Sequence, residues 1–99
     1  MFKISRAKFE MMPNGDVSKC LEYKDIAVEE TISEAFFIYD ALIYTDIEKL
    51  DLDSDTADRT DFNGILEHAN FYNKDRTLKV FYLIMREADN EYFISKREN

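Results

Sequence analysis

The clearest pattern in the chain is a run of apolar residues at helical spacing between residues 32 and 50. Successive apolar positions are three or four residues apart, so they share one face of an amphipathic helix. Thr31-Ile32-Ser33-Glu34 has the spacing of a capping box, which marks a helix N-terminus. We therefore predict a helix from Ile32 to Leu50, with a buried strand over the β-prone residues 36–39 as the alternative. The predicted apolar face comprises Ile32, Ala35, Phe36, Tyr39, Leu42, Ile43, Ile47 and Leu50.

Two segments before this helix mix polar and apolar residues and are separated by Pro13-Asn14-Gly15-Asp16. An Asn-Gly pair between such segments is a hairpin signal, because glycine adopts a positive φ without steric cost. Alternation of apolar and polar residues on both sides suits strands with one solvated face. We predict a hairpin with strands at residues 2–11 and 17–24.

The second half of the chain is expected to contain the remaining strands. Residues 51–61 are rich in Asp, Ser and Thr, which compete with the backbone for hydrogen bonds, so we predict a polar loop there. Residues 65–72 fit either a strand or a short helix, and 73–75 form a turn. Residues 77–86 are apolar on both faces, which indicates a strand in the middle of its sheet. A last strand is predicted at 92–96.

Together these elements predict an α+β fold in the order ββαβββ. About five strands form an antiparallel sheet, and one main helix packs on a face of it. The chain of 99 residues, 45% of them hydrophobic, is enough for one domain spanning residues 1–99.

Catalytic residue patterns are missing from the sequence. His68 is the only histidine and Cys20 the only cysteine, so a zinc site of ordinary ligand composition cannot be assembled. We interpret His68 as a surface or packing residue and Cys20 as a small apolar residue in a strand. Two separated glycines cannot form a phosphate-binding loop. We expect no enzyme activity and no cofactor.

The segment Asp51-Leu52-Asp53-Ser54-Asp55 resembles the start of a calcium-binding loop. Such a loop requires glycine at its sixth position and a bidentate glutamate at its twelfth. Thr56 and Phe62 occupy these positions here. We therefore predict no metal site in this segment.

The lone cysteine favours a reducing compartment. The N-terminal residues are charged at short intervals and lack the apolar core of a signal peptide. The longest apolar run, residues 80–85, is too short to span a bilayer. We expect a soluble, cytoplasmic protein that does not bind membranes.

Charge is concentrated in the middle of the chain. Residues 25–67 contain thirteen acidic and two basic side chains, a local balance of −11, whereas residues 1–24 and 68–99 carry +2 and +1. Self-repulsion of this kind lowers stability. Selection for binding a basic partner would explain it, and a solvated surface is the alternative interpretation.

The predicted helix also carries aromatic residues away from its core face. Phe37 and Tyr44 are seven residues apart and share that outer side with acidic residues. Aromatic rings framed by carboxylates are typical of a protein interface, although a loop or second layer covering the rings is the alternative. We predict a partner-binding surface formed by Phe37, Asp40, Tyr44, Asp46, Glu48, Asp51, Asp53, Asp55, Asp58 and Asp61.

An acidic surface repels nucleic acid and attracts the basic groove that binds it. This favours a stoichiometric inhibitor of a nuclease toxin, that is, an immunity protein or antitoxin. A phage-encoded anti-CRISPR or antirestriction inhibitor that mimics DNA charge is the alternative within the same class. We expect a monomer away from its basic partner and no direct nucleic-acid binding. A structural or adaptor subunit that self-associates is the alternative of a different class.

One short segment bears on the choice between these inhibitors. Residues 89–95, Asp-Asn-Glu-Tyr-Phe-Ile-Ser, are similar to the last-strand segment of the colicin-type ribonuclease immunity proteins. The resemblance covers seven of 99 residues, and no site residue is carried over from it. It implies the toxin-immunity class.

Overall fold

A computed structural model of the chain describes residues 1–62 and 65–86, and for residues 56, 57, 61, 62 and 65 it describes the backbone alone. These residues form five strands and one helix in the order ββαβββ, which confirms the predicted α+β class. The elements are β1 (Phe2–Met11), β2 (Val17–Glu29), α1 (Ile32–Lys49), β3 (Leu52–Phe62), β4 (Ile65–Asn73) and β5 (Leu78–Arg86).

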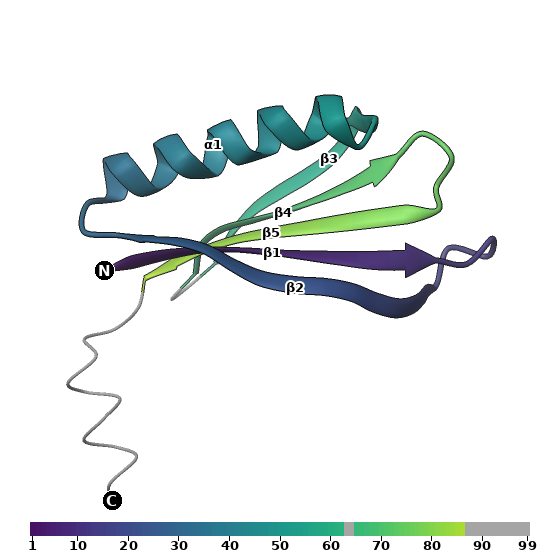
Figure 1. Cartoon of the computed structure of the whole chain (residues 1–99), viewed down its shortest axis with the longest axis horizontal. Coiled ribbons are helices and arrows are strands. Elements are labelled where there is room, and N and C mark those ends of the chain that lie inside the picture. The colour runs from purple at the N-terminus through teal and green to yellow at the C-terminus, as the bar shows by residue number, and fades with distance from the viewer. Residues whose placement is uncertain (63–64, 87–99) are drawn as a thin grey trace, which may run out of the picture.

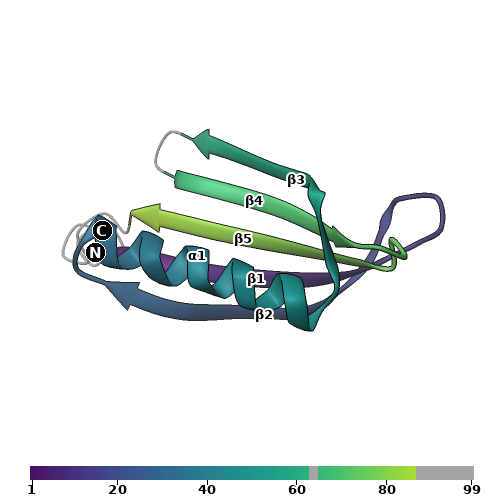
Figure 2. The same ribbon diagram turned by 90° about the horizontal axis from the view of Figure 1, so that it is seen from above.

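The five strands form a single sheet in the order β2-β1-β5-β4-β3, with every neighbouring pair antiparallel. β5 is the middle strand, as its two apolar faces predicted. The helix α1 lies across one face of the sheet (Figure 1), and β2 and β3 form the two edges (Figure 2). Each edge strand therefore has one side whose backbone groups pair with no other strand of the described part of the chain.

The predicted hairpin is confirmed and consists of β1 and β2. Its turn contains Gly15 at a φ of 91°, and the side-chain oxygen of Asn14 accepts a hydrogen bond from the backbone of Asp16. β2 continues five residues beyond the predicted end, to Glu29, and leads directly into the helix. The end of an edge strand and the start of α1 therefore lie close together.

The helix begins at the predicted residue, Ile32, and ends one residue before the predicted Leu50. The Thr31 hydroxyl accepts a hydrogen bond from the backbone amide of Glu34 at 3.2 Å, and Leu50 is the C-cap residue. Asp51 then adopts a left-handed conformation, with a φ of 53°, and the chain turns into β3. The inner face of the helix buries Ala35, Tyr39 and Ile43 against Ile4, Val80, Tyr82 and Ile84 of the sheet.

The prediction of a polar loop at residues 51–61 was wrong, because these residues form most of β3. Leu52 is buried in the core, and the strand pairs with β4 on one side only. At a sheet edge, acidic side chains stay in water and also discourage pairing with other chains. Side chains do compete for backbone hydrogen bonds at one place in the strand. The Asp53 side chain accepts a hydrogen bond from the backbone amide of Asp55, where the register of β3 against β4 shifts.

Residues 65–72 were predicted as strand or helix, and they form strand β4. The predicted turn at residues 73–75 is confirmed, and the Asn73 side chain stabilises it by accepting hydrogen bonds from the amides of Thr77 and Leu78. The strand predicted at residues 92–96 and the segment 89–95 lie outside the described residues.

Candidate functional site

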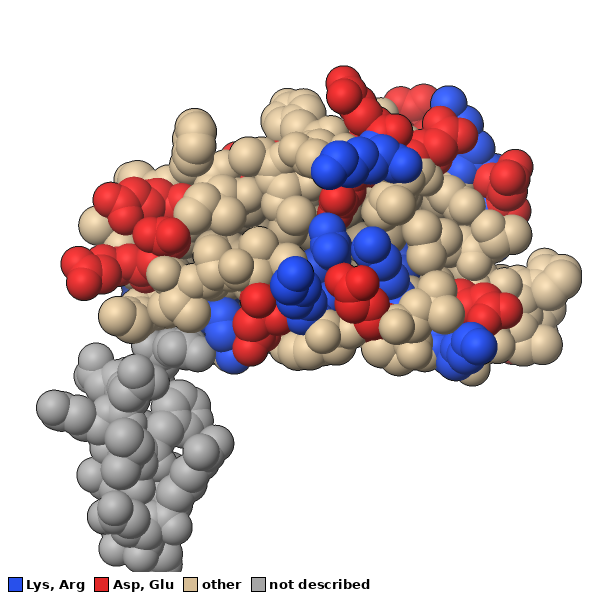
Figure 3. Space-filling model, in the orientation of Figure 1, with Lys and Arg blue, Asp and Glu red and all other residues tan. Residues whose placement is uncertain are grey.

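Charged side chains are unevenly distributed on the surface. Figure 3 shows the molecule from the same side as Figure 1. Acidic side chains are grouped at the end of the molecule where α1 begins, and acidic and basic side chains are mixed over the rest of the visible face. The carboxylates of this end come from the last residue of β2 and from the first residues around α1. They are Glu29, Glu30 and Glu34, which we call the helix-start cluster.

The outer face of α1 displays the two aromatic residues that were predicted to lie there. Phe37 is 76% exposed and Tyr44 is 73% exposed, so no loop or second layer formed by residues 1–62 and 65–86 covers them. Positions three or four residues apart share a face of a helix, and Glu34, Ala41 and Glu48 are exposed on the same stripe. The structure therefore confirms that both rings lie exposed on the outer face of α1, with glutamates on the same stripe.

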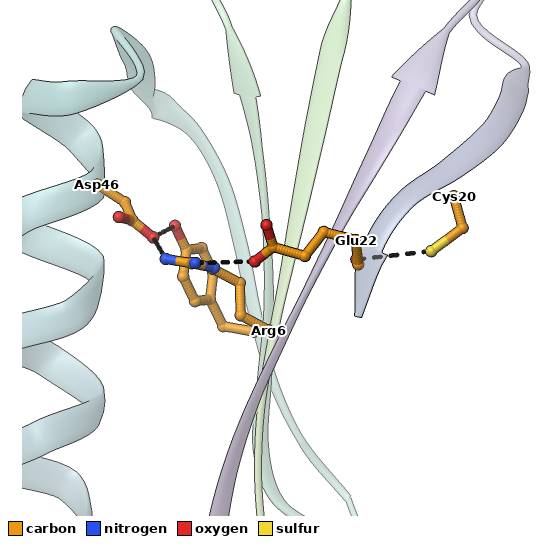
Figure 4. Close-up of polar contacts among 5 residues, drawn as sticks. Arg6, Cys20, Glu22 and Asp46 are labelled. Carbon is orange, nitrogen blue, oxygen red and sulfur yellow. Dashed lines mark hydrogen bonds and ion pairs between the residues drawn. The ribbon is translucent and has the colours of Figure 1, made fainter. Parts of the chain in front are cut away.

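Asp46 was predicted to belong to the partner-binding surface, and this placement was wrong. Its side chain points from α1 to the sheet and is only 6% exposed. There it accepts hydrogen bonds from the guanidinium of Arg6 at 2.8 Å and from the hydroxyl of Tyr82 at 2.9 Å (Figure 4). Asp46 therefore links the helix to β1 and β5 by hydrogen bonds, and its burial makes it inaccessible to a partner.

The same network reaches the edge strand, because Arg6 also donates to Glu22 of β2 at 3.1 Å. Burial alone would lower the pKa of Arg6, but its hydrogen bonds to Asp46 and Glu22 outweigh burial and raise it. The hydrogen bond from Arg6, followed by the charge of Lys8, lowers the pKa of Glu22. Burial, followed by the charge of Asp46, raises the pKa of Tyr82.

A second network involves Asp40, another residue of the predicted surface. Arg59 of β3 donates to Asp40 at 2.9 Å and to Glu67 of β4 at 2.7 and 3.0 Å. Its guanidinium carbon lies 5.5 Å from the ring centroid of Tyr39. Burial lowers the pKa of Arg59, but the bonds to Glu67 and Asp40 outweigh it and raise the pKa. Burial, then the charge of Glu67, raises the pKa of Tyr39.

The remaining predicted acids lie near or on β3. Asp51 forms an exposed ion pair with Lys74 at 3.1 Å. Asp53 accepts the backbone hydrogen bond described above, and Asp58 accepts one from the Thr60 hydroxyl. The side chain of Asp61 lies outside the described part of the structure. Within that part, the exposed carboxylates of Glu48, Asp55 and Asp58 form no ion pair.

The sequence-based site omitted the helix-start cluster. Over residues 1–62 and 65–86, none of Glu29, Glu30 and Glu34 forms an ion pair. The signal that could have identified it was the Glu-Glu pair just before the capping box. The capping-box spacing predicts a role for Glu34 in the helix cap, but among the described residues its carboxylate makes no hydrogen bond back to Thr31.

Each exposed ring of α1 borders a hollow. The Phe37 hollow has a volume of about 460 Å³ and is lined by Glu29, Ser33, Glu34, Phe37 and Ile38. The Tyr44 hollow has a volume of about 270 Å³ and lies between α1 and β3. Its lining comprises Asp40, Ile43, Tyr44, Ile47, Ser54, Arg59 and Phe71.

The side chains that could support other chemistry lie apart from one another in the described part of the chain. Residues 1–62 and 65–86 contain no group of three His, Cys, Asp or Glu side chains placed to hold a metal ion. His68 packs on the ring of Phe81 at 5.7 Å between centroids, and Cys20 is exposed with a free thiol. No helix in this part of the chain is long and apolar enough to cross a bilayer.

The surface thus offers exposed aromatic rings together with carboxylates that lack cationic partners among the described residues. This combination suits contact with a cationic protein surface, since rings supply buried area and carboxylates supply attraction. No protein-family model, curated protein or solved structure gives a significant match to this chain.

Proposed function

We propose that this protein is a small, non-catalytic acidic inhibitor that binds and blocks the basic surface of a nuclease-type partner. The observation that carries the proposal is the outer face of α1, where Phe37 and Tyr44 stand largely exposed in a chain of net charge −8. The two rings lie seven residues apart on one exposed stripe of α1 that glutamates border, and exposed apolar surface rimmed by polar residues is typical of interaction sites. Aromatic residues of this kind often supply most of the binding energy of an interface.

The nature of the partner follows from charge. Proteins that bind nucleic acid line their grooves with Lys and Arg, and an acidic surface competes for the same groove. Attraction between opposite surfaces raises the association rate by orders of magnitude and declines with salt. A toxin-immunity protein is the first candidate, and a phage-encoded inhibitor of a defence nuclease is the alternative. In this proposal the protein is cytoplasmic and monomeric away from its partner.

Carboxylates that form no ion pair among the described residues lie near both ends of the helix and support this proposal. The helix-start cluster lies at one end of α1, and Glu48 lies near the other. Asp55 and Asp58 extend the acidic surface onto the edge strand β3. Acids that are already paired inside the chain contribute less, because a partner cation would compete with an existing one.

A second candidate function is self-association, and one observation favours it. β2 is an edge strand of 13 residues that exposes Val17, Leu21, Tyr23 and Val28. Such an edge can pair with the same strand of another copy. Light scattering distinguishes the two functions, because an inhibitor of this kind is a monomer without its partner, whereas an adaptor dimerises as its concentration rises.

The proposed function is tested by capture followed by an inhibition assay. Wild-type protein, a Phe37→Ala/Tyr44→Ala variant and an Asp53→Asn/Asp55→Asn/Asp58→Asn variant serve as baits in a lysate of the source cell, at low and moderate salt. We expect the wild type to retain a basic nuclease that the aromatic variant loses. The acidic variant should retain it less well at moderate salt.

An inhibition assay with the purified nuclease then tests whether binding blocks its activity. Titration with the wild-type protein should abolish cleavage of nucleic acid at a fixed stoichiometry, and the aromatic variant should require far more protein. A captured nuclease that remains fully active when saturated with wild-type protein contradicts the proposal. Retention of the same proteins by all three baits contradicts it as well.

A further inference from the structure

We propose that the Phe37 hollow binds an arginine side chain of the basic partner. This inference rests on the proposed function. The hollow joins the end of β2 to the first two turns of α1. It has a volume of about 460 Å³ and is open to solvent, so a side chain of a partner can enter it from the surface. The exposed ring of Phe37 and the side chain of Ile38 give it an apolar wall.

Carboxylates line the same hollow from two elements. Glu29 comes from the last position of β2 and Glu34 from the first turn of α1, with Glu30 exposed between them in the chain. No cation is paired with any of the three within the described residues. Among the described residues the Glu34 carboxylate accepts no hydrogen bond from the Thr31 amide, so it is not used as a helix cap. The hollow is therefore apolar in its wall and negative around it.

The chain itself contains an example of the contact that we propose. Arg59 lies between the carboxylates of Asp40 and Glu67, and its guanidinium lies over the ring of Tyr39. The Phe37 hollow provides the same three groups, two carboxylates and an aromatic ring, without a guanidinium among the described residues. An arginine brought by a partner would complete this set in the same way.

Arginine fits this set of groups better than lysine does. Its planar guanidinium stacks on an aromatic ring and can donate to two carboxylates at once. Lysine has a compact and strongly hydrated charge, which gains less from contact with an apolar wall. The Phe37 hollow should therefore discriminate between the two cations, whereas a purely electrostatic surface should not.

The test compares an arginine-rich and a lysine-rich peptide of equal length and charge, with binding followed by fluorescence anisotropy. The wild type should bind the arginine-rich peptide about fivefold tighter, the factor expected from one cation–π contact. Phe37→Ala should abolish this preference. Tyr44→Ala is the matched control, since it removes an equally exposed ring outside the hollow and should keep the preference.

Charge variants complete the test. Glu29→Gln/Glu34→Gln and Asp55→Asn/Asp58→Asn change the net charge by the same amount, but only the first pair should abolish the preference for arginine. Equal binding of both peptides by the wild type would overturn the proposal. So would a preference that survives Phe37→Ala or is lost equally in Tyr44→Ala.

Failure of this inference can be told apart from failure of the proposed function. If a nuclease is captured and inhibited while the wild type shows no preference for the arginine-rich peptide, the proposed inhibitor function is supported and the arginine-binding site is refuted. If the wild type and its variants show the expected preference for arginine but no nuclease is inhibited, the arginine-binding site is supported and the nuclease partner is refuted.

Discussion

The two hollows on α1 differ in what their carboxylates already hold. In the Tyr44 hollow, Asp40 binds Arg59, so this hollow contains its own cation. In the Phe37 hollow, Glu29 and Glu34 form no ion pair among the described residues. Both hollows border an exposed ring and belong to the same acidic stretch of sequence. Pairing across the fold, and not the density of acids along the chain, therefore decides which carboxylates remain available.

The difference follows from the topology of the sheet. Arg59 projects from β3 to the helix and satisfies Asp40, and Arg6 projects from β1 and satisfies Asp46. The end of β2 beside the start of α1 brings glutamates and no described cation.

Removal of the Asp46 charge should cause the largest loss of stability. Asp46→Asn leaves Arg6 partly buried without its main anionic partner, and breaking a buried pair costs about 3–5 kcal/mol. Urea unfolding should show a lower midpoint with an unchanged m-value. The matched change Glu34→Gln, at an exposed position of the same helix, should cost less than about 1 kcal/mol. Equal stability of the two variants would contradict the structural role of Asp46.

Alkaline pH should weaken both internal networks. Because the pKa values of Tyr39 and Tyr82 are raised in the fold, the folded protein keeps protons that the unfolded chain loses. The free energy of unfolding should thus be unaffected by these groups below about pH 10 and should fall above it, by about 1.4 kcal/mol per pH unit for each tyrosine. Tyr39→Phe should remove half of this slope. An unchanged slope in that variant would show that Tyr39 ionises equally easily in both states.

Removing Arg59 should free the carboxylate of Asp40 in the Tyr44 hollow. Arg59→Gln leaves Asp40 and Glu67 without their cation and, because the pair is partly exposed, should cost about 1 kcal/mol. The same variant should bind the arginine-rich peptide more tightly than the wild type does, since a second site opens. If peptide binding is unchanged, internal pairing does not govern which hollow is available.

Neutralising the helix-start cluster should have the smallest effect on stability. Glu29→Gln/Glu34→Gln removes charges without described ion pairs, so the free energy of unfolding should change by less than about 1 kcal/mol. A loss as large as that of Asp46→Asn would mean that these glutamates serve the fold instead of a partner. Thermal or urea unfolding of the two variants under one condition makes the comparison.

Local sequence signals predicted much of this fold. Capping at Thr31, helical periodicity, the Asn-Gly turn and the doubly apolar β5 each reflect short-range physics that the sequence displays directly. β3 was missed because its acids are acceptable on an edge strand, and a strand's position at an edge depends on the whole sheet. The helix was predicted correctly although residues 36–39 favour strands, because periodicity over many residues outweighs local preference.

The candidate site was less predictable. Asp46 follows Tyr39 by seven residues and so shares the inner face of the helix, a position that the helical spacing already implied. Its partners Arg6 and Tyr82 lie 40 and 36 residues away, and only the strand register brings them together. The same holds for Asp40 with Arg59. Which acids are paired therefore depends on long-range pairing that no local pattern displays.

The most direct test of the central claim measures the affinity of the captured nuclease for two double variants. Glu29→Gln/Glu34→Gln and Asp40→Asn/Asp51→Asn change the net charge equally, but the first pair forms no ion pair among the described residues and the second is paired with Arg59 and Lys74. We predict that the first pair weakens binding by about tenfold or more and the second by less than about threefold. Equal weakening by both pairs would contradict the claim that internal pairing selects the carboxylates that bind the partner.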